Sequence, residues 1–116
     1  MKYIIAVIQP DRLQETLDEL ENQEIHLVTV TQVVGRGNQK GLAELYRGHK
    51  EAGSLLRKVK IEIAVNEEFA EKAITAISVS AKTGDGSIGD GKIFVLDLHD
   101  CVRIRTGERG GDAIGA

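Results

Sequence analysis

The 116-residue sequence is poor in aromatic residues and in cysteine, and each shortage excludes a class of function. It has no Trp, two Tyr and two Phe, so base-stacking surfaces and aromatic cages have few candidate residues. The single cysteine, Cys101, excludes an internal disulfide framework and fits a reducing compartment. No apolar run approaches the roughly 20 residues that cross a bilayer, and the first ten residues lack a small-residue cleavage site. We therefore expect a cytoplasmic protein without membrane insertion.

The sequence also has little proline and a small net charge. One Pro, 41% hydrophobic and 28% charged residues are typical of a globular chain, and the length predicts a single domain over residues 1–116. The net charge of −3 argues against a broadly basic nucleic-acid surface.

The apolar periodicity predicts six elements in the order β-α-β-β-α-β. This order indicates an α+β, ferredoxin-like fold with a four-stranded antiparallel sheet and two helices on one face. The expected strands cover residues 2–8, 25–34, 58–65 and 93–98, with Val102 to Ile104 continuing or pairing with the last one. The expected helices cover residues 11–22 and a segment capped by Asn66 that ends near Gly84.

Two features suggest partners. The first and fourth strands are apolar on both faces, so the second sheet face needs a cover, for which a closed ring of identical copies is the simplest candidate. The alternative is that its small residues tolerate water. Residues 36–56 form a loop too long for a hairpin, either a docking loop for a partner or a floppy insertion.

The thirteen glycines all lie from residue 35 onward, in three clusters. Residues 84–89 match G-x-G-x-x-G, but they follow a predicted helix and precede a strand, the reverse of a dinucleotide-binding fold. Their backbone N–H groups and the Lys92 ammonium can still form an anion site. An ordinary helix-to-strand turn is the alternative.

A second basic feature lies near the C-terminus. Arg103 and Arg105 are spaced i, i+2, so on a strand both guanidinium groups point the same way and suit a phosphate or carboxylate. A solvated edge strand is the alternative. Cys101 is expected as a buried small hydrophobe in an apolar strand, and the three His residues show no metal-ligand spacing.

Five segments together resemble the PII signal-transduction family, in order and over essentially the whole chain. They are residues 35–41 (GRGNQKG), 44–48 (ELYRG), 58–63 (KVKIEI), 88–95 (IGDGKIFV) and 103–108 (RIRTGE). The resemblance implies a homotrimer with ATP or ADP in the clefts between subunits. It also implies a T-loop at residues 37–55 that binds a regulated transporter, enzyme or transcription regulator, a phosphate-binding B-loop at 82–92 and a C-terminal loop at 103–116.

The resemblance also assigns roles to residues. Adenine and ribose would contact Val7, Thr29, Gly35, Gly37, Glu62 and Ala64. The phosphates would contact Gly89, Asp90, Gly91, Lys92, Arg103 and Arg105. Gln39 would ligate Mg²⁺ when ATP and 2-oxoglutarate bind together, and 2-oxoglutarate would contact Gln39, Lys40 and Lys58.

The sequence departs from the family pattern at several of these sites. The positions of the uridylylated Tyr and the phosphorylated Ser are Glu51 and His49, so neither covalent switch is available there. Position 50 carries Lys50 in place of a common Glu, Gln9 replaces a common Lys and Asn38 a common Arg. Residues 85–87 (DGS) stand where the family usually has one residue, which lengthens the phosphate loop.

The sequence thus predicts a non-enzymatic sensor of ATP, ADP and 2-oxoglutarate. Alternatives are a PII-like sensor of another adenine nucleotide or of carbon status, a weak nucleotide hydrolase, and an RNA-binding module of the same topology. The last needs aromatic residues on the central strands, where only Tyr3 and Phe94 are expected.

Overall fold

A computed structural model describes residues 1–37 and 55–115 of the chain. Most of the expected T-loop, with Gln39 and Lys40, lies outside these residues. The described elements are β1 (Lys2–Ile8), η1 (Pro10–Arg12), α1 (Leu13–Asn22), β2 (Thr29–Gly35), β3 (Leu56–Val65), α4 (Glu67–Ala81), β4 (Gly91–Asp97) and α5 (Gly111–Ile114). Within them, no helix is both long enough and apolar enough to cross a membrane.

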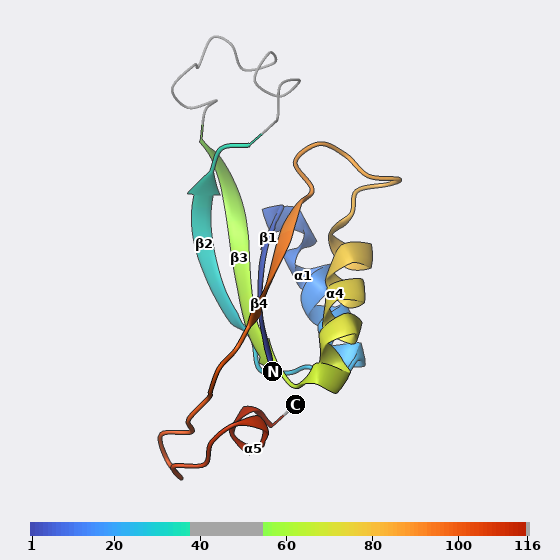
Figure 1. The fold of residues 1–116 in the computed structure, drawn as a ribbon. Coiled ribbons are helices and arrows are strands. Elements are labelled where there is room, and N and C mark those ends of the chain that lie inside the picture. Colours follow the sequence, from blue (N-terminus) through green and yellow to red (C-terminus); the bar gives the residue numbers. More distant parts are fainter. Residues whose placement is uncertain (38–54, 116) are drawn as a thin grey trace.

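The four strands form one antiparallel sheet in the order β2-β3-β1-β4, and α1 and α4 lie side by side on one of its faces (Figure 1). The predicted α+β arrangement with its four-stranded antiparallel sheet is therefore confirmed. The order places β1 and β3 in the centre and β4 at an edge. The expectation of Phe94 on a central strand was wrong, because among the described strands β4 pairs with β1 alone.

Strict alternation along the central strands builds the core. Ile4, Ala6 and Ile8 of β1 face the helices and are at most 1% exposed, and alternate residues of β3 from Val59 to Val65 join them. Burying this apolar surface between sheet and helices supplies the main driving force for the fold. At the interface of the two helices, the buried hydroxyls of Thr16 and Ser80 lie 3.0 Å apart.

The opposite face of the sheet carries no helix among the described residues. Strand register places Tyr3, Ile5 and Val7 of β1 beside Phe94 and Leu96 of β4 on this open face. Phe94 and Leu96 are 49% and 47% exposed, so an apolar strip faces outward. The expectation that β1 and β4 are apolar on both faces is met, and no helix or strand of the described residues covers this strip.

Three element boundaries differ from the sequence expectation. The second strand begins at Thr29 rather than at residue 25, because the Ile25 N–H donates to the Leu20 carbonyl and closes the turn after α1. Helix α1 begins at Leu13, after a 3-10 turn that starts at Pro10. Helix α4 ends at Ala81, where Arg12 donates two hydrogen bonds to the Ser80 carbonyl and satisfies one of the last helical acceptors.

Candidate functional site

The loop between α4 and β4, residues 82–90, consists of two successive turns. The Gly86 N–H donates to the Thr83 carbonyl at 2.9 Å, and the Asp90 N–H donates to the Ser87 carbonyl at 3.1 Å. One Asp90 carboxylate oxygen accepts N–H bonds from both turns, from Thr83 at 3.0 Å and Ser87 at 2.8 Å. These bonds, led by that from Ser87, lower the pKa of Asp90. Asp90 therefore stabilises the lengthened loop from within.

The loop joins the sheet at Gly91, where only glycine fits. Gly91 has a φ of +116°, and an added Cβ would overlap the carbonyl oxygen of Val7. The Ile8–Gly91 register pair begins β4 at this point. The close approach of the two backbones therefore fixes the glycine loop against the end of β1.

A pocket of about 470 Å³ lies beside this junction. Seven of its ten lining residues are residues that the sequence singled out: Val7, Gly35, Gly37, Lys58, Gly89, Gly91 and Lys92. They come from β1, the end of β2 and the residues after it, β3, the loop before β4 and the start of β4. The structure thus brings the expected B-loop and the beginning of the expected T-loop to one end of the sheet (Figure 1).

Lys58 connects two walls of this pocket. Its side chain is buried, and its ammonium donates to the carbonyl of Gly89 at 3.0 Å. Burial lowers the pKa of Lys58, and the nearby Asp90 carboxylate opposes that shift. A buried ammonium with a carbonyl partner is poised to exchange that partner for a carboxylate, because an ion pair suits a partly desolvated charge better than a neutral acceptor does.

Thr29, Glu62 and Ala64 lie outside the pocket but on the same open face. Thr29 of β2 pairs with Glu62 of β3, and Val7 of β1 pairs with Lys92 of β4. The two pairs are two residues apart along the strands, so they lie on the same face. The Glu62 carboxylate accepts a hydrogen bond from the Tyr3 hydroxyl and faces Lys60 at 3.6 Å. The bond from Tyr3 is the main cause that lowers the pKa of Glu62. The open face therefore carries polar groups on β2 and β3 beside the apolar strip of β1 and β4.

The segment between β4 and α5, which contains Arg103 and Arg105, lies at the opposite end of the sheet (Figure 1). The seven residues of β4 alone separate the two ends by roughly 20 Å at about 3.4 Å per residue. The expectation that both arginines share a strand was wrong. Residues 104–106 form a turn, since the Gly107 N–H donates to the Arg103 carbonyl at 2.7 Å, and only Val102 makes an isolated bridge, to Arg109. Cys101 likewise lies outside the strands and is only partly buried.

Three pocket residues were not assigned to the site from the sequence. Arg36, Ile88 and Phe94 complete its lining, and Ile88 is 66% exposed. Arg36 and Ile88 are neighbours of assigned glycines, and Phe94 lies two residues after Lys92, on the same face of β4. The period-2 rule applied to Lys92 could have found Phe94. Arg36 and Ile88 depend on loop geometry, which the sequence pattern does not give.

Comparison with known proteins decides the family. The family model "Nitrogen regulatory protein P-II" matches residues 1–108. The chain belongs to this P-II family. It is 52% identical to the nitrogen regulatory protein GlnK1 of Methanosarcina mazei and 51% identical to P-II 1 of Methanothermobacter thermautotrophicus, covering 98% of this chain and 97% of each relative. It is 49% identical to the P-II protein of Rhodospirillum rubrum, covering 98% of this chain and all of that protein.

The close approach at Gly91 predicts a stability difference between two P-II loop glycines. Gly91→Ala adds a steric overlap to backbone strain, whereas Gly84→Ala, with φ +57° and open space around it, adds strain alone. We expect Gly84→Ala to lower the free energy of unfolding by about 1 kcal/mol and Gly91→Ala by at least about 2 kcal/mol more. Urea denaturation measures both. Equal losses would contradict the packing described for Gly91.

The Asp90 hydrogen bonds predict a pH dependence. Because folding lowers the pKa of Asp90, its contribution to stability is present above the ordinary pKa of 3.8 and is lost as the pH falls through the folded value. Asp90→Asn should therefore destabilise the protein at pH 7 more than at pH 3. Asp85→Asn, the same charge change in the same loop, should show a smaller difference between the two pH values. Thermal melts at both pH values test this, and parallel behaviour of the two variants would count against it.

Proposed function

We propose that this protein is a homotrimeric P-II signal-transduction protein that binds ATP and ADP competitively. In this proposal Mg²⁺ and 2-oxoglutarate bind together with ATP, and the protein signals through residues 37–55. The observation that carries the proposal is the pocket in which the glycine loop, Lys92 and the end of β2 converge. Its relatives are named nitrogen regulatory proteins, which supports a regulatory rather than an enzymatic role.

The glycine loop and Lys92 suit a phosphate chain. The loop has positive-φ glycines at positions 84, 86, 89 and 91, and glycine turns of this kind form anion-binding concavities. Lys92 adds a full positive charge on the open face beside Val7. The apolar side chains of Val7 and Phe94 supply contact surface for a purine ring in the same pocket.

A second copy of the chain is needed to bring in the arginines. The segment with Arg103 and Arg105 follows the far end of β4, one strand length from the pocket, so the arginines cannot close the pocket in their own subunit. Three copies that pack their open faces together would cover the apolar strip of Tyr3, Ile5 and Phe94 and set the arginines of one copy beside the pocket of another. One assembly would thus meet both requirements.

The site is connected to the expected docking loop. Gly35, Arg36 and Gly37 line the pocket immediately before residue 38, where the T-loop continues. A ligand that favours one arrangement of this junction shifts the loop and hence its affinity for a partner. The partner class in our proposal is a transporter, enzyme or transcription regulator in the cytoplasm.

Nucleotide binding tests the proposal directly. Lys92→Ala and Arg105→Ala should each weaken ATP binding about tenfold or more, because each removes a charge-assisted contact worth about 1.5–3 kcal/mol. Lys72→Ala, the same charge change on α4, should have little effect. Calorimetry with ATP and ADP measures these affinities, with phosphate release followed in parallel to detect hydrolysis. No binding by the wild-type protein at millimolar nucleotide would remove the proposal.

Mixed assemblies add a control for the shared site. The experiment folds Lys92→Ala subunits together with Arg105→Ala subunits. At some interfaces the native Lys92 of one copy then faces the native Arg105 of its neighbour, so a fraction of full-affinity sites should return. Light scattering on the same samples reports the number of subunits. Failure of the mixture to recover any tight site would show that the two residues do not meet between copies.

Lys58 should determine the response to 2-oxoglutarate. Lys58→Met keeps the bulk of the side chain and removes the ammonium that faces Gly89, whereas Lys60→Met makes the same change at a lysine outside the pocket. We expect Lys58→Met to weaken 2-oxoglutarate binding in the presence of Mg-ATP at least about tenfold, and Lys60→Met to leave it nearly unchanged. Titration of 2-oxoglutarate into each variant checks this. Equal effects would exclude a specific role for Lys58.

A further inference from the structure

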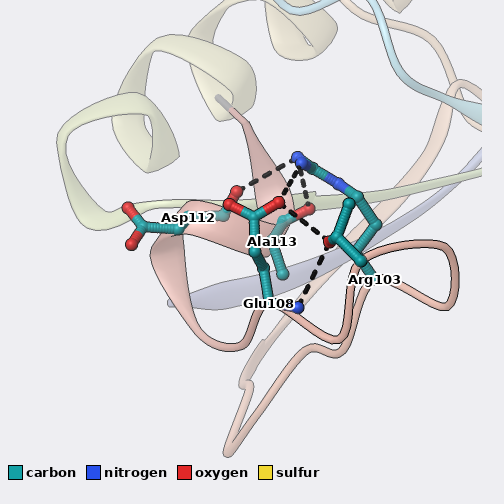
Figure 2. A network of polar contacts seen from close by, with 5 residues as sticks. Arg103, Glu108, Asp112 and Ala113 are labelled. Carbon is teal, nitrogen blue, oxygen red and sulfur yellow. Dashed lines mark hydrogen bonds and ion pairs between the residues drawn. The ribbon is translucent and has the colours of Figure 1, made fainter.

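The guanidinium of Arg103 is held by the C-terminal loop of its own chain. One terminal nitrogen donates to the Glu108 carboxylate at 2.7 Å, and the other lies 3.1 Å and 3.3 Å from the main-chain carbonyls of Asp112 and Ala113 in α5 (Figure 2). The same Glu108 oxygen accepts a hydrogen bond from the Thr106 hydroxyl at 2.8 Å. We call Arg103, Thr106, Glu108 and the two α5 carbonyls the Arg103 clasp.

Arg105 differs from Arg103 although both were expected to bind phosphate. It is exposed and forms no ion pair with any residue in the described parts of the chain. Its charge is therefore available to an external anion. Arg103 can offer its charge to such an anion only if the anion replaces or shares the Glu108 carboxylate, because an arginine neutralised by a carboxylate attracts a second anion weakly.

We propose that Glu108 is a built-in competitor for Arg103, a carboxylate that occupies the guanidinium until the phosphate chain of a nucleotide displaces it. This inference rests on the proposed nucleotide function, since it names a residue that controls the affinity of the same site. Arg103 would therefore contact the nucleotide phosphates only after Glu108 is displaced, whereas Arg105 could contact them directly. The clasp also ties the turn at residues 103–108 to α5, so displacement of Glu108 loosens the C-terminal loop.

The exposure of the pair makes displacement feasible. The side chains of Arg103 and Glu108 are 35% and 45% exposed, so water screens their attraction and little energy is lost when the pair opens. A triphosphate carries several negative charges and more acceptor oxygens than one carboxylate, so it outcompetes Glu108 for the guanidinium. The neighbouring pair of Arg109 and Asp100, at 2.5 Å, and the Val102–Arg109 bridge hold the base of the loop when the clasp opens.

The sign of one substitution distinguishes this role from a structural one. Glu108→Gln keeps the size of the side chain and its carbonyl acceptor but removes its charge. A competitor role predicts ATP binding about three- to fivefold tighter than wild type, the gain from removing an exposed ion pair. A purely structural role predicts weaker binding, because a loosened loop would lose its ordered arginine.

Asp112→Asn is the matched control. It removes one negative charge from the same loop, but only the main-chain carbonyl of Asp112 contacts Arg103, while its carboxylate points away (Figure 2). We expect its effect on ATP affinity to be less than about half of that of Glu108→Gln. Thr106→Val, which removes a donor to Glu108 and leaves all charges in place, should tighten binding slightly.

Calorimetry with ATP and with inorganic triphosphate measures these affinities, and hydrogen exchange of residues 111–115 follows the clasp without ligand. Faster exchange in Glu108→Gln together with tighter ATP binding supports the proposal. Unchanged or weaker binding, or an equal gain in Asp112→Asn, overturns it. If the wild-type protein binds no nucleotide, the proposed function fails. Independently of that result, hydrogen exchange of residues 111–115 that is slower or unchanged in Glu108→Gln would refute the clasp.

Discussion

The contact of the Gly91 backbone with the Val7 carbonyl sets the geometry on which the rest of the site depends. It allows β4 to pair with β1 up to the last residue of β1, and it fixes the loop that precedes β4 at the end of the sheet, beside Val7. Once the loop lies there, Lys58 reaches the Gly89 carbonyl and Lys92 stands beside Val7. A side chain at position 91 would overlap the Val7 carbonyl and push the loop away from Val7 and Lys58.

The elements of the fold were predictable because each has a strong local signal. The alternation in residues 58–65 and the apolar stripe of the first helix identified strand and helix, and the order of elements identified the topology. The start of β2 was not predictable in this way. Ile25 and Val28 look like strand residues, but Ile25 is buried and Val28 partly buried where the turn after α1 packs on the core, so tertiary packing overrides their propensity.

The site was predictable only in part, and the division follows the fold. Residues near the glycine loop and at the end of β2 converge because, in an antiparallel sheet, the end of one strand lies beside the beginning of its neighbour. The arginines were placed on a strand by their spacing, yet Gly107 and the bond from its N–H to the Arg103 carbonyl turn the chain there. The partnership of Arg103 with Glu108 and α5 depends on that turn, and no periodicity in the sequence encodes it.

These constraints give the two ends of the sheet different tasks. At one end, the glycine loop is held in shape by its own hydrogen bonds through Asp90, so the proposed anion site there would change little when an anion binds. At the other end, Glu108 balances the charge of Arg103, whereas Arg105 has no ion pair with the residues that the structure describes. An anion bridging two copies would meet a fixed cradle on one and an adjustable clasp on the other. Discrimination between ligands of different charge would then arise chiefly at the clasp, because the Glu108 carboxylate must be displaced there before Arg103 can bind an anion.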